Sequence, residues 1–226
     1  MHFTPQEIWA ATGLPVRIVL AVMMLMAVWC LYVAVERTLA LAKARRQSRL
    51  IAEQVAGPLS AANPVDALAI CEKDEYGASY LGRLLVGGLT EFSGRKDKHG
   101  IEAAERALER VAITEGQALR KGLNILATTG STAPFVGLVG TIFGIINAFQ
   151  MMGEAGGGDL AAISSGIAEA LITTAIGISV AIIGVWLFNY FTAKIDEITN
   201  DMQVSVQEIL DWCEKQILPP MTDSDS

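Results

Sequence analysis

Three side chains within long apolar stretches of this chain, Thr141, Thr174 and Glu169, are of types that can move or hold protons. A threonine hydroxyl donates and accepts hydrogen bonds, so it can relay a proton through water or steady a nearby carboxylate without carrying charge. Alternatively, the hydroxyl has a purely structural role and donates to the carbonyl oxygen one turn earlier on its own helix. Glu169 is the one carboxylate between Leu160 and Ala193. An ionisable group at membrane depth is usually functional, but a structural contact beyond the outer end of the hydrocarbon core explains Glu169 equally well.

The elements that must position these side chains are three apolar segments, at residues 18–35, 123–152 and 160–193. The first has 18 uncharged residues and spans about 27 Å as a helix, close to the thickness of a hydrocarbon core. With 52% hydrophobic and 18% charged residues, the composition indicates an all-α polytopic membrane protein with three transmembrane helices. A cleaved signal peptide is the alternative for the first segment. It is disfavoured because an acidic residue, Glu7, precedes it in place of a basic region.

Small residues mark one side of the second and third segments. Lipid gains nothing from a stripe of glycine, whereas small residues let neighbouring backbones approach closely. The sequence therefore predicts helix packing, and the lining of a central pore, at Pro134, Gly137, Gly140, Gly144, Gly166, Ala170, Gly177 and Ala181.

The basic residues predict the orientation of the chain. A cluster directly after the first segment, within residues 36–122, consists of Arg37, Lys43, Arg45, Arg46 and Arg49. By the positive-inside rule, residues 36–122 and the C-terminal residues 194–226 are cytoplasmic, and residues 1–17 and the turn at 153–159 lie outside. Arg17, on the outer flank of the first segment, does not outweigh the cluster.

The cytoplasmic part is predicted to be helical. Leu39 to Val55 has a helix-forming composition, and Gly57-Pro58 indicates a break after it. Asn63 is a plausible cap for a short helix from Pro64 to Cys71. Another helix is expected over Tyr80 to Glu91.

A polar loop at Gly94 to Gly100 and an amphipathic helix at Ile101 to Lys121 follow. Glu115 falls among the apolar positions of that helix, which are spaced by three and four residues. Because no breaker is recognised after it, this helix is expected to run unbroken into the second spanning helix. The third spanning helix is expected to continue to Pro219. Two spanning helices would thus extend into a cytoplasmic helical bundle.

Other classes of function find little support in the sequence. The two histidines, His2 and His99, lie outside the apolar segments, so a membrane serine nucleophile has no obvious base. The three cysteines, at positions 30, 71 and 213, show neither pairing nor metal-ligand spacing. We therefore expect no enzyme, no metal, no cofactor and no nucleic-acid partner. A passive membrane scaffold stays open, because it explains the glycine stripes, although not the threonines and the glutamate.

Two motifs carry a resemblance to a known family. The run PFVGLVGTIFGI at 134–145, followed by Phe149, resembles the second-helix signature of the MotA/TolQ/ExbB proton-channel family, in its TolQ/ExbB-like branch. The run GIAEALITTAIG at 166–177, followed by Ala181-Ile182, resembles its third helix. One departure is that many relatives have a proline after the Ala-Ile pair, where this chain has Ile183.

The resemblance implies a ring-forming stator or channel subunit of an inner-membrane motor driven by the proton-motive force. It implies a homopentamer around an ExbD/TolR-type single-span partner, which supplies a membrane aspartate. Thr141 and Thr174 would line the proton path, with Glu169 near its outer part. The work done would be import energisation, envelope integrity or gliding-type motility, through a periplasmic or outer-membrane effector.

Overall fold

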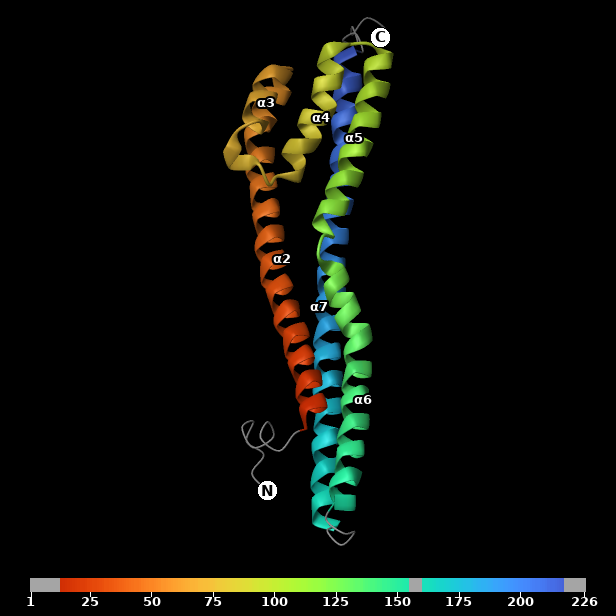
Figure 1. Ribbon diagram of the computed structural model, residues 1–226. Coiled ribbons are helices and arrows are strands. Elements are labelled where there is room, and N and C mark those ends of the chain that lie inside the picture. The colour runs from red at the N-terminus through yellow and green to blue at the C-terminus, as the bar shows by residue number, and fades with distance from the viewer. Residues whose placement is uncertain (1–12, 155–159, 218–226) are drawn as a thin grey trace, which may run out of the picture. The chain divides into compact units, whose positions relative to one another are not determined.

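The computed structural model describes residues 13–154 and 160–217, and within them every regular element is a helix (Figure 1). This confirms the all-α fold. The helices are α2 (Leu14–Ser60), α3 (Pro64–Cys71), the 3₁₀ helix η1 (Asp74–Tyr76), α4 (Tyr80–Gly94), α5 (Lys98–Leu119), α6 (Leu123–Glu154) and α7 (Leu160–Ile217).

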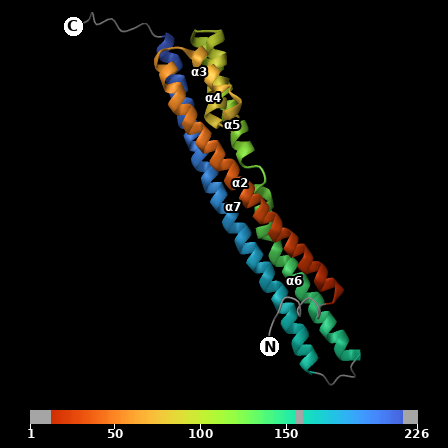
Figure 2. The same ribbon diagram turned by 90° about the vertical axis from the view of Figure 1, so that its left-hand side faces the viewer.

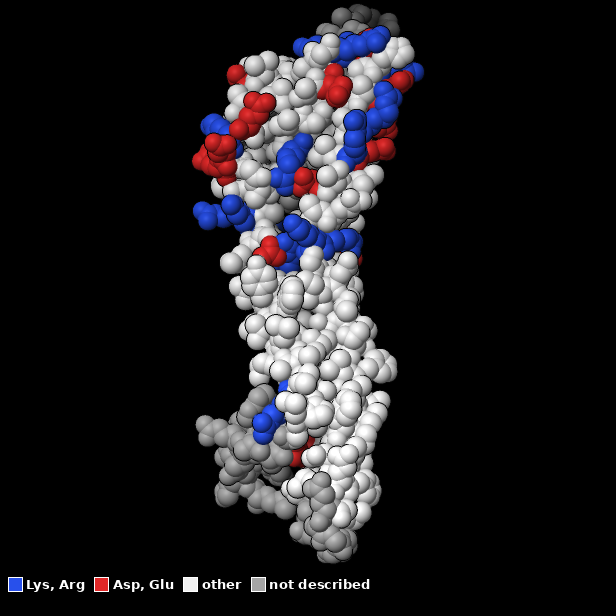
Figure 3. Space-filling view, viewed as in Figure 1, with Lys and Arg blue, Asp and Glu red and all other residues white. Residues whose placement is uncertain are grey.

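Contacts divide the chain into two compact units. We call Met1–Val35 with Gly122–Phe191 the apolar unit, and Glu36–Lys121 with Thr192–Ser226 the charged unit. Helices α2 and α7 contribute residues to both. Charged side chains gather over the charged unit in Figure 3, whereas the visible surface of the apolar unit is almost uncharged. Helices α2, α6 and α7 are each long and apolar enough to cross a membrane, as three spanning segments require.

The charged unit has a hydrophobic core to which α4 and α7 contribute, together with Ile51 of α2 and Leu108 of α5. Leu85, Leu89 and Phe92 of α4 are fully buried, as are Ile198 and Met202 of α7. These positions recur at intervals of three and four residues, which places them on one face of each helix. The amphipathic pattern of the sequence is therefore what holds this unit together.

Polar caps begin three helices of the charged unit. The Asn63 side chain accepts a hydrogen bond from the Asp66 amide at the start of α3, so the predicted helix from Pro64 to Cys71 is confirmed. Ser79 caps α4 in the same way, and Asp97 caps α5. Because Asp97 satisfies an amide of the first turn, α5 starts inside the predicted polar loop.

The prediction that the amphipathic helix runs unbroken into the second spanning helix is wrong. Helix α5 ends at Leu119 and α6 begins at Leu123. Between them Gly122 has φ +84°, a left-handed conformation that glycine adopts without the steric cost of a Cβ. The Arg37 guanidinium of α2 donates 3.2 Å to the Leu119 carbonyl oxygen and so satisfies part of the exposed end of α5. The two spanning helices that continue into the charged unit are therefore α2 and α7.

The predicted break at Gly57-Pro58 is also absent, because α2 continues to Ser60. Pro58 lies in the last turn, where the amide it lacks removes only one hydrogen bond near the helix end. Trp212 of α7 donates from Nε1 to the Leu59 carbonyl oxygen at 2.9 Å. This contact with α7 thus stabilises the last turn of α2, although Gly57-Pro58 favours a helix end there.

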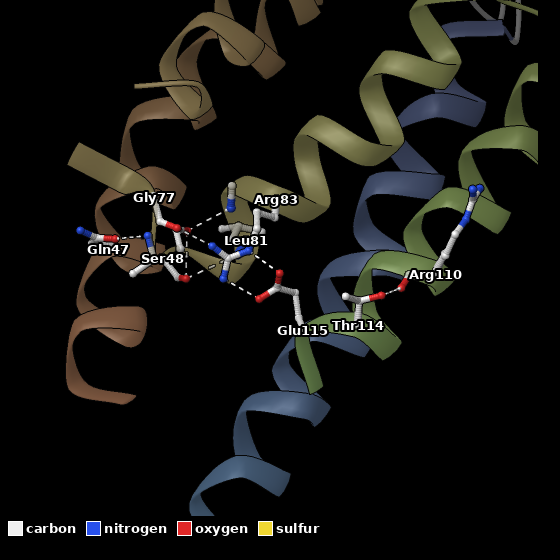
Figure 4. A network of polar contacts seen from close by, with 11 residues as sticks. Gln47, Ser48, Gly77, Leu81, Arg83, Arg110, Thr114 and Glu115 are labelled. Atoms are coloured by element: carbon white, nitrogen blue, oxygen red, sulfur yellow. Dashed lines mark hydrogen bonds and ion pairs between the residues drawn. The ribbon is translucent and has the colours of Figure 1, made fainter. Parts of the chain in front are cut away.

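Glu115 does lie on the inner face of α5, where its carboxylate forms an ion pair with Arg83 of α4 (Figure 4). Glu115 is buried, and Arg83 also donates to the Gly77 carbonyl oxygen. Ser48 and Ser79 continue the network, with their hydroxyl oxygens 3.0 Å apart. These contacts join α2, α4 and α5 through polar groups of which Ser48, Ser79 and Glu115 are buried and Arg83 is partly exposed.

Replacing Arg83 with glutamine is expected to lower the free energy of unfolding by about 2 kcal/mol, because the Glu115 carboxylate is left buried without its partner. Chemical denaturation of the purified protein in detergent measures this loss. Arg106→Gln, on the exposed side of α5, is the control and should change little. Equal effects of the two variants would contradict a stabilising role for the Arg83–Glu115 pair.

Candidate functional site

Helices α6 and α7 run antiparallel along a seam of small residues in the apolar unit, and both views show them side by side (Figure 1 and Figure 2). A Cβ built on Gly144 would lie 2.7 Å from the Cβ of Ala170, and one on Gly166 would lie 2.6 Å from that of Ala148. From Gly144 to Ala148 the chain advances four residues along α6, while the contacted residue moves back four along α7, from Ala170 to Gly166. The backbones can approach this closely only because these positions lack side-chain bulk.

Farther along the seam, toward the start of α6, glycine residues of α7 pack directly against the backbone of α6. A Cβ on Gly177 would lie 2.7 Å from the Ala133 carbonyl oxygen and 3.0 Å from the Gly137 Cα. Ala181 packs with Ala133 in a small buried cluster, and a Cβ on Gly140 would meet the Thr173 hydroxyl at 2.8 Å.

The small residues predicted for packing therefore lie between two helices of the same chain. Bulky α6 residues are exposed instead: Phe135, Leu138, Ile142 and Phe149. Pro134 is half-buried inside α6 and does not interrupt it.

Thr141 and Thr174 meet across this seam. Their hydroxyl groups are in direct hydrogen-bond contact, and both side chains are half-buried. The Thr141 hydroxyl also lies 3.3 Å from the Ala170 carbonyl oxygen, and both hydroxyls lie within 3.2 Å of the Gly137 carbonyl oxygen. The hydroxyl pair thus links the two helices by a hydrogen bond along which a proton could be relayed. The Thr141 hydroxyl can instead donate to the Gly137 carbonyl oxygen, one turn earlier on its own helix.

Glu169 is not part of this hydroxyl pair. It is half-buried on α7, five residues before Thr174, which is about 7.5 Å along the helix axis. Among the described residues no hydrogen bond joins Glu169 to either Thr141 or Thr174. A proton moving between the carboxylate and the hydroxyls would need water or a partner's side chain between them.

Sequence reasoning missed two features of the seam. Thr173 is fully buried, and its hydroxyl donates to the Ala170 carbonyl oxygen at 2.7 Å. A Cβ on Gly184 would lie 3.1 Å from the Gly130 amide nitrogen. Gly130 and Gly184 add one further contact to the seam. Their glycines continue the small-residue stripe of each helix, and this continuation is the sequence signal that could have predicted the contact. Nothing in the sequence distinguished the buried Thr173 from its neighbour.

The described residues hold no group of three or more metal-ligand side chains. The three cysteines are free and buried. Burial raises the pKa of the Cys71 thiol to about 11, so this thiol is protonated near neutral pH and is a poor nucleophile.

Three long apolar helices, of which α6 and α7 meet along a small-residue seam that contains a hydroxyl pair, define an α-helical membrane protein with a polar contact between two spanning helices. Residues 78–204 match the model of the MotA/TolQ/ExbB proton channel family. The chain belongs to this family.

The curated relatives include members named ExbB and TolQ. A biopolymer transport protein ExbB of Xanthomonas campestris pv. campestris is 40% identical over 124 residues, 52% of this chain and 47% of that protein. A Tol-Pal system protein TolQ of Pseudomonas aeruginosa is 44% identical over 114 residues, 47% of this chain and 49% of that protein. The chain thus spans about half the length of these two relatives. An ExbB of Neisseria meningitidis serogroup A is 29% identical over 88% of this chain and 92% of that protein.

Proposed function

We propose that this chain is the ring-forming channel and stator subunit of a motor in the bacterial inner membrane, driven by the proton-motive force. Proton flow at the interface with an ExbD/TolR-type single-span partner would be coupled to work on the periplasm or cell envelope. The observation that carries this proposal is the contact between the Thr141 and Thr174 hydroxyls, within helices that match the family. A proton path needs groups that both donate and accept hydrogen bonds at membrane depth.

The missing part of the path is an acidic group that takes up and releases the proton. The apolar unit offers Glu169, which does not contact the threonine pair. A membrane aspartate on the partner would supply the acid beside Thr141 and Thr174, and the hydroxyls would steady it in either protonation state. Several copies of this chain, five in our proposal, would surround the partner's single helices, as closed symmetric rings do.

The proposed orientation rests on the basic residues that follow the first span. Arg37, Lys43, Arg46 and Arg49 all lie in the charged unit, so we place that unit in the cytoplasm and residues 153–159 in the periplasm. In this orientation Glu169 lies toward the periplasmic end of α7 and the hydroxyl pair lies deeper. Protons would meet the glutamate before the threonines.

The test is potential-driven proton flux through the complex in liposomes. The chain is co-expressed and purified with its ExbD/TolR-type partner, a potassium-diffusion potential is imposed, and internal pH is followed with a trapped dye. We expect flux from the complex and little from the chain alone. Replacing the partner's membrane aspartate with asparagine should abolish the flux. An intact complex with no flux, or with flux that survives this replacement, would rule the proposal out.

A passive scaffold is the second candidate, favoured by the close glycine seam between α6 and α7. Such packing by itself makes a stable assembly without conduction. The flux experiment separates the two functions, because a scaffold holds its partner equally well when the partner's aspartate is replaced and conducts in neither case.

A further inference from the structure

Within residues 13–35, 122–153 and 163–191 of the apolar unit, the only charged residues are Arg17 and Glu169. They come from different helices, α2 and α7. A charge in apolar surroundings is costly unless an opposite charge balances it.

Contacts with α6 show that the two residues lie at nearly the same depth. A Cβ on Gly13 would lie 3.4 Å from the Asn147 side chain, and one on Gly140 would lie 2.9 Å from the Val19 side chain. Helix α2 therefore runs antiparallel to α6 in this region. Arg17 lies between Gly13 and Val19 in sequence, so it is level with the α6 residues just before Gly144.

The α6–α7 seam then places Glu169 at this level. Gly144 meets Ala170, the residue next to Glu169. The depth difference between Arg17 and Glu169 is about two residues, or about 3 Å along the helix axes. The Nε atom of Arg17 is shielded from solvent, and Glu169 is half-buried.

We propose that Arg17 is the counter-charge of Glu169, and that this pair across α2 and α7 sets the charge at the outer part of the proton path. The inference rests on the proposed function. Arg17 is a positioning residue: it balances the carboxylate and keeps it at the seam, and it takes up no proton itself, because a guanidinium stays charged. Loss of either charge removes this attraction between α2 and α7.

A double-mutant cycle tests the pairing without reference to proton flow. Arg17→Gln and Glu169→Gln are each expected to lower the midpoint of thermal unfolding of the detergent-purified oligomer by about 3 °C. The double variant should lose clearly less than the sum, because the second replacement removes an attraction that the first has already removed. Arg46→Gln, on an exposed part of α2, is the control. Strictly additive losses would overturn the pairing and leave Arg17 as an anchor to lipid headgroups.

Proton flux provides the second readout. Arg17→Lys keeps the positive charge and should retain flux within about twofold, whereas Arg17→Gln should lower it about tenfold. The reversed pair, Arg17→Glu with Glu169→Arg, should assemble better than either reversal alone. If Arg17→Lys behaves as Arg17→Gln does, the charge is not what matters and the inference fails. A complex that conducts no protons but shows the coupling overturns the proposed function and not the pairing.

Discussion

Replacing Thr141 or Thr174 with valine is expected to reduce potential-driven proton flux, and the work that depends on it in cells, about tenfold or more. Valine has nearly the shape of threonine but neither donates nor accepts a hydrogen bond. The two hydroxyls contact each other across α6 and α7, so either replacement removes one of the two groups that could hand a proton on. The remaining hydroxyl keeps its bond to the Gly137 carbonyl oxygen, so the folded structure should persist. One proton crossing 100 mV yields about 2.3 kcal/mol, so a barrier of that size added to proton transfer is enough to stall the cycle.

The control for this experiment is a threonine whose hydroxyl bonds only to the carbonyl oxygen of its own helix. Thr132, also on α6, donates to the Thr128 carbonyl oxygen one turn earlier at 2.7 Å. Thr132→Val should therefore leave flux and work near the wild-type level. Serine at position 141 or 174 keeps the hydroxyl and should have a milder effect than valine.

Assembly must be measured in parallel, by oligomer size and by co-purification of the partner. We expect both valine variants to assemble and to hold the partner normally, since the shape of the seam is preserved. Normal flux and normal activity in both would show that the hydroxyls serve only as bonds to their own helix. Failure to assemble would show that they hold α6 and α7 together.

The arrangement of α6 and α7 shows what the sequence can and cannot predict. The small residues Gly137 and Gly144 and the hydroxyl Thr141 share one side of α6 at helical spacing, and this periodicity is readable without a structure. The contact between Thr141 and Thr174 depends on the antiparallel register of two helices. That register follows from the packing of the whole seam and from no local pattern.

Local signals were sufficient for some helix ends and insufficient for others. Asn63 is predictable as a cap because asparagine commonly begins a helix, and its side chain does bond within the first turn of α3. Gly122 is an equally local signal, because a glycine after Arg120 and Lys121 is a common end of a helix. The spacing of the apolar residues of α5 predicts that Glu115 lies on its inner face. That its charge is balanced there by Arg83 depends on the packing of α4 against α5, which periodicity cannot predict.

Replacing Gly144 with alanine is expected to lower the free energy of unfolding by about 2 kcal/mol, because the new Cβ would lie 2.7 Å from that of Ala170. Two helix backbones would have to move apart to relieve this clash. Gly57→Ala is the matched control: it also lies within a helix, but a Cβ there meets no described atom within 4 Å. Helix propensity alone should make that variant neutral or more stable by up to about 1 kcal/mol.

Combining Gly144→Ala with Ala170→Gly tests whether the loss of stability comes from the contact between these two positions. Adding Ala170→Gly removes the Cβ that Gly144→Ala would strike, so the double variant should recover part of the stability lost, although Ala170→Gly alone costs about 1 kcal/mol in a helix. Denaturation in detergent measures all four members of the cycle, and oligomer size shows whether the ring survives. Gly137→Leu, which forces a larger side chain against the Thr173 carbonyl, should also separate the hydroxyl pair one turn away and lower proton flux. If the losses from Gly144→Ala and Ala170→Gly simply add, the close approach of α6 and α7 does not depend on these residues, and the same glycines would have to act between neighbouring copies of the chain.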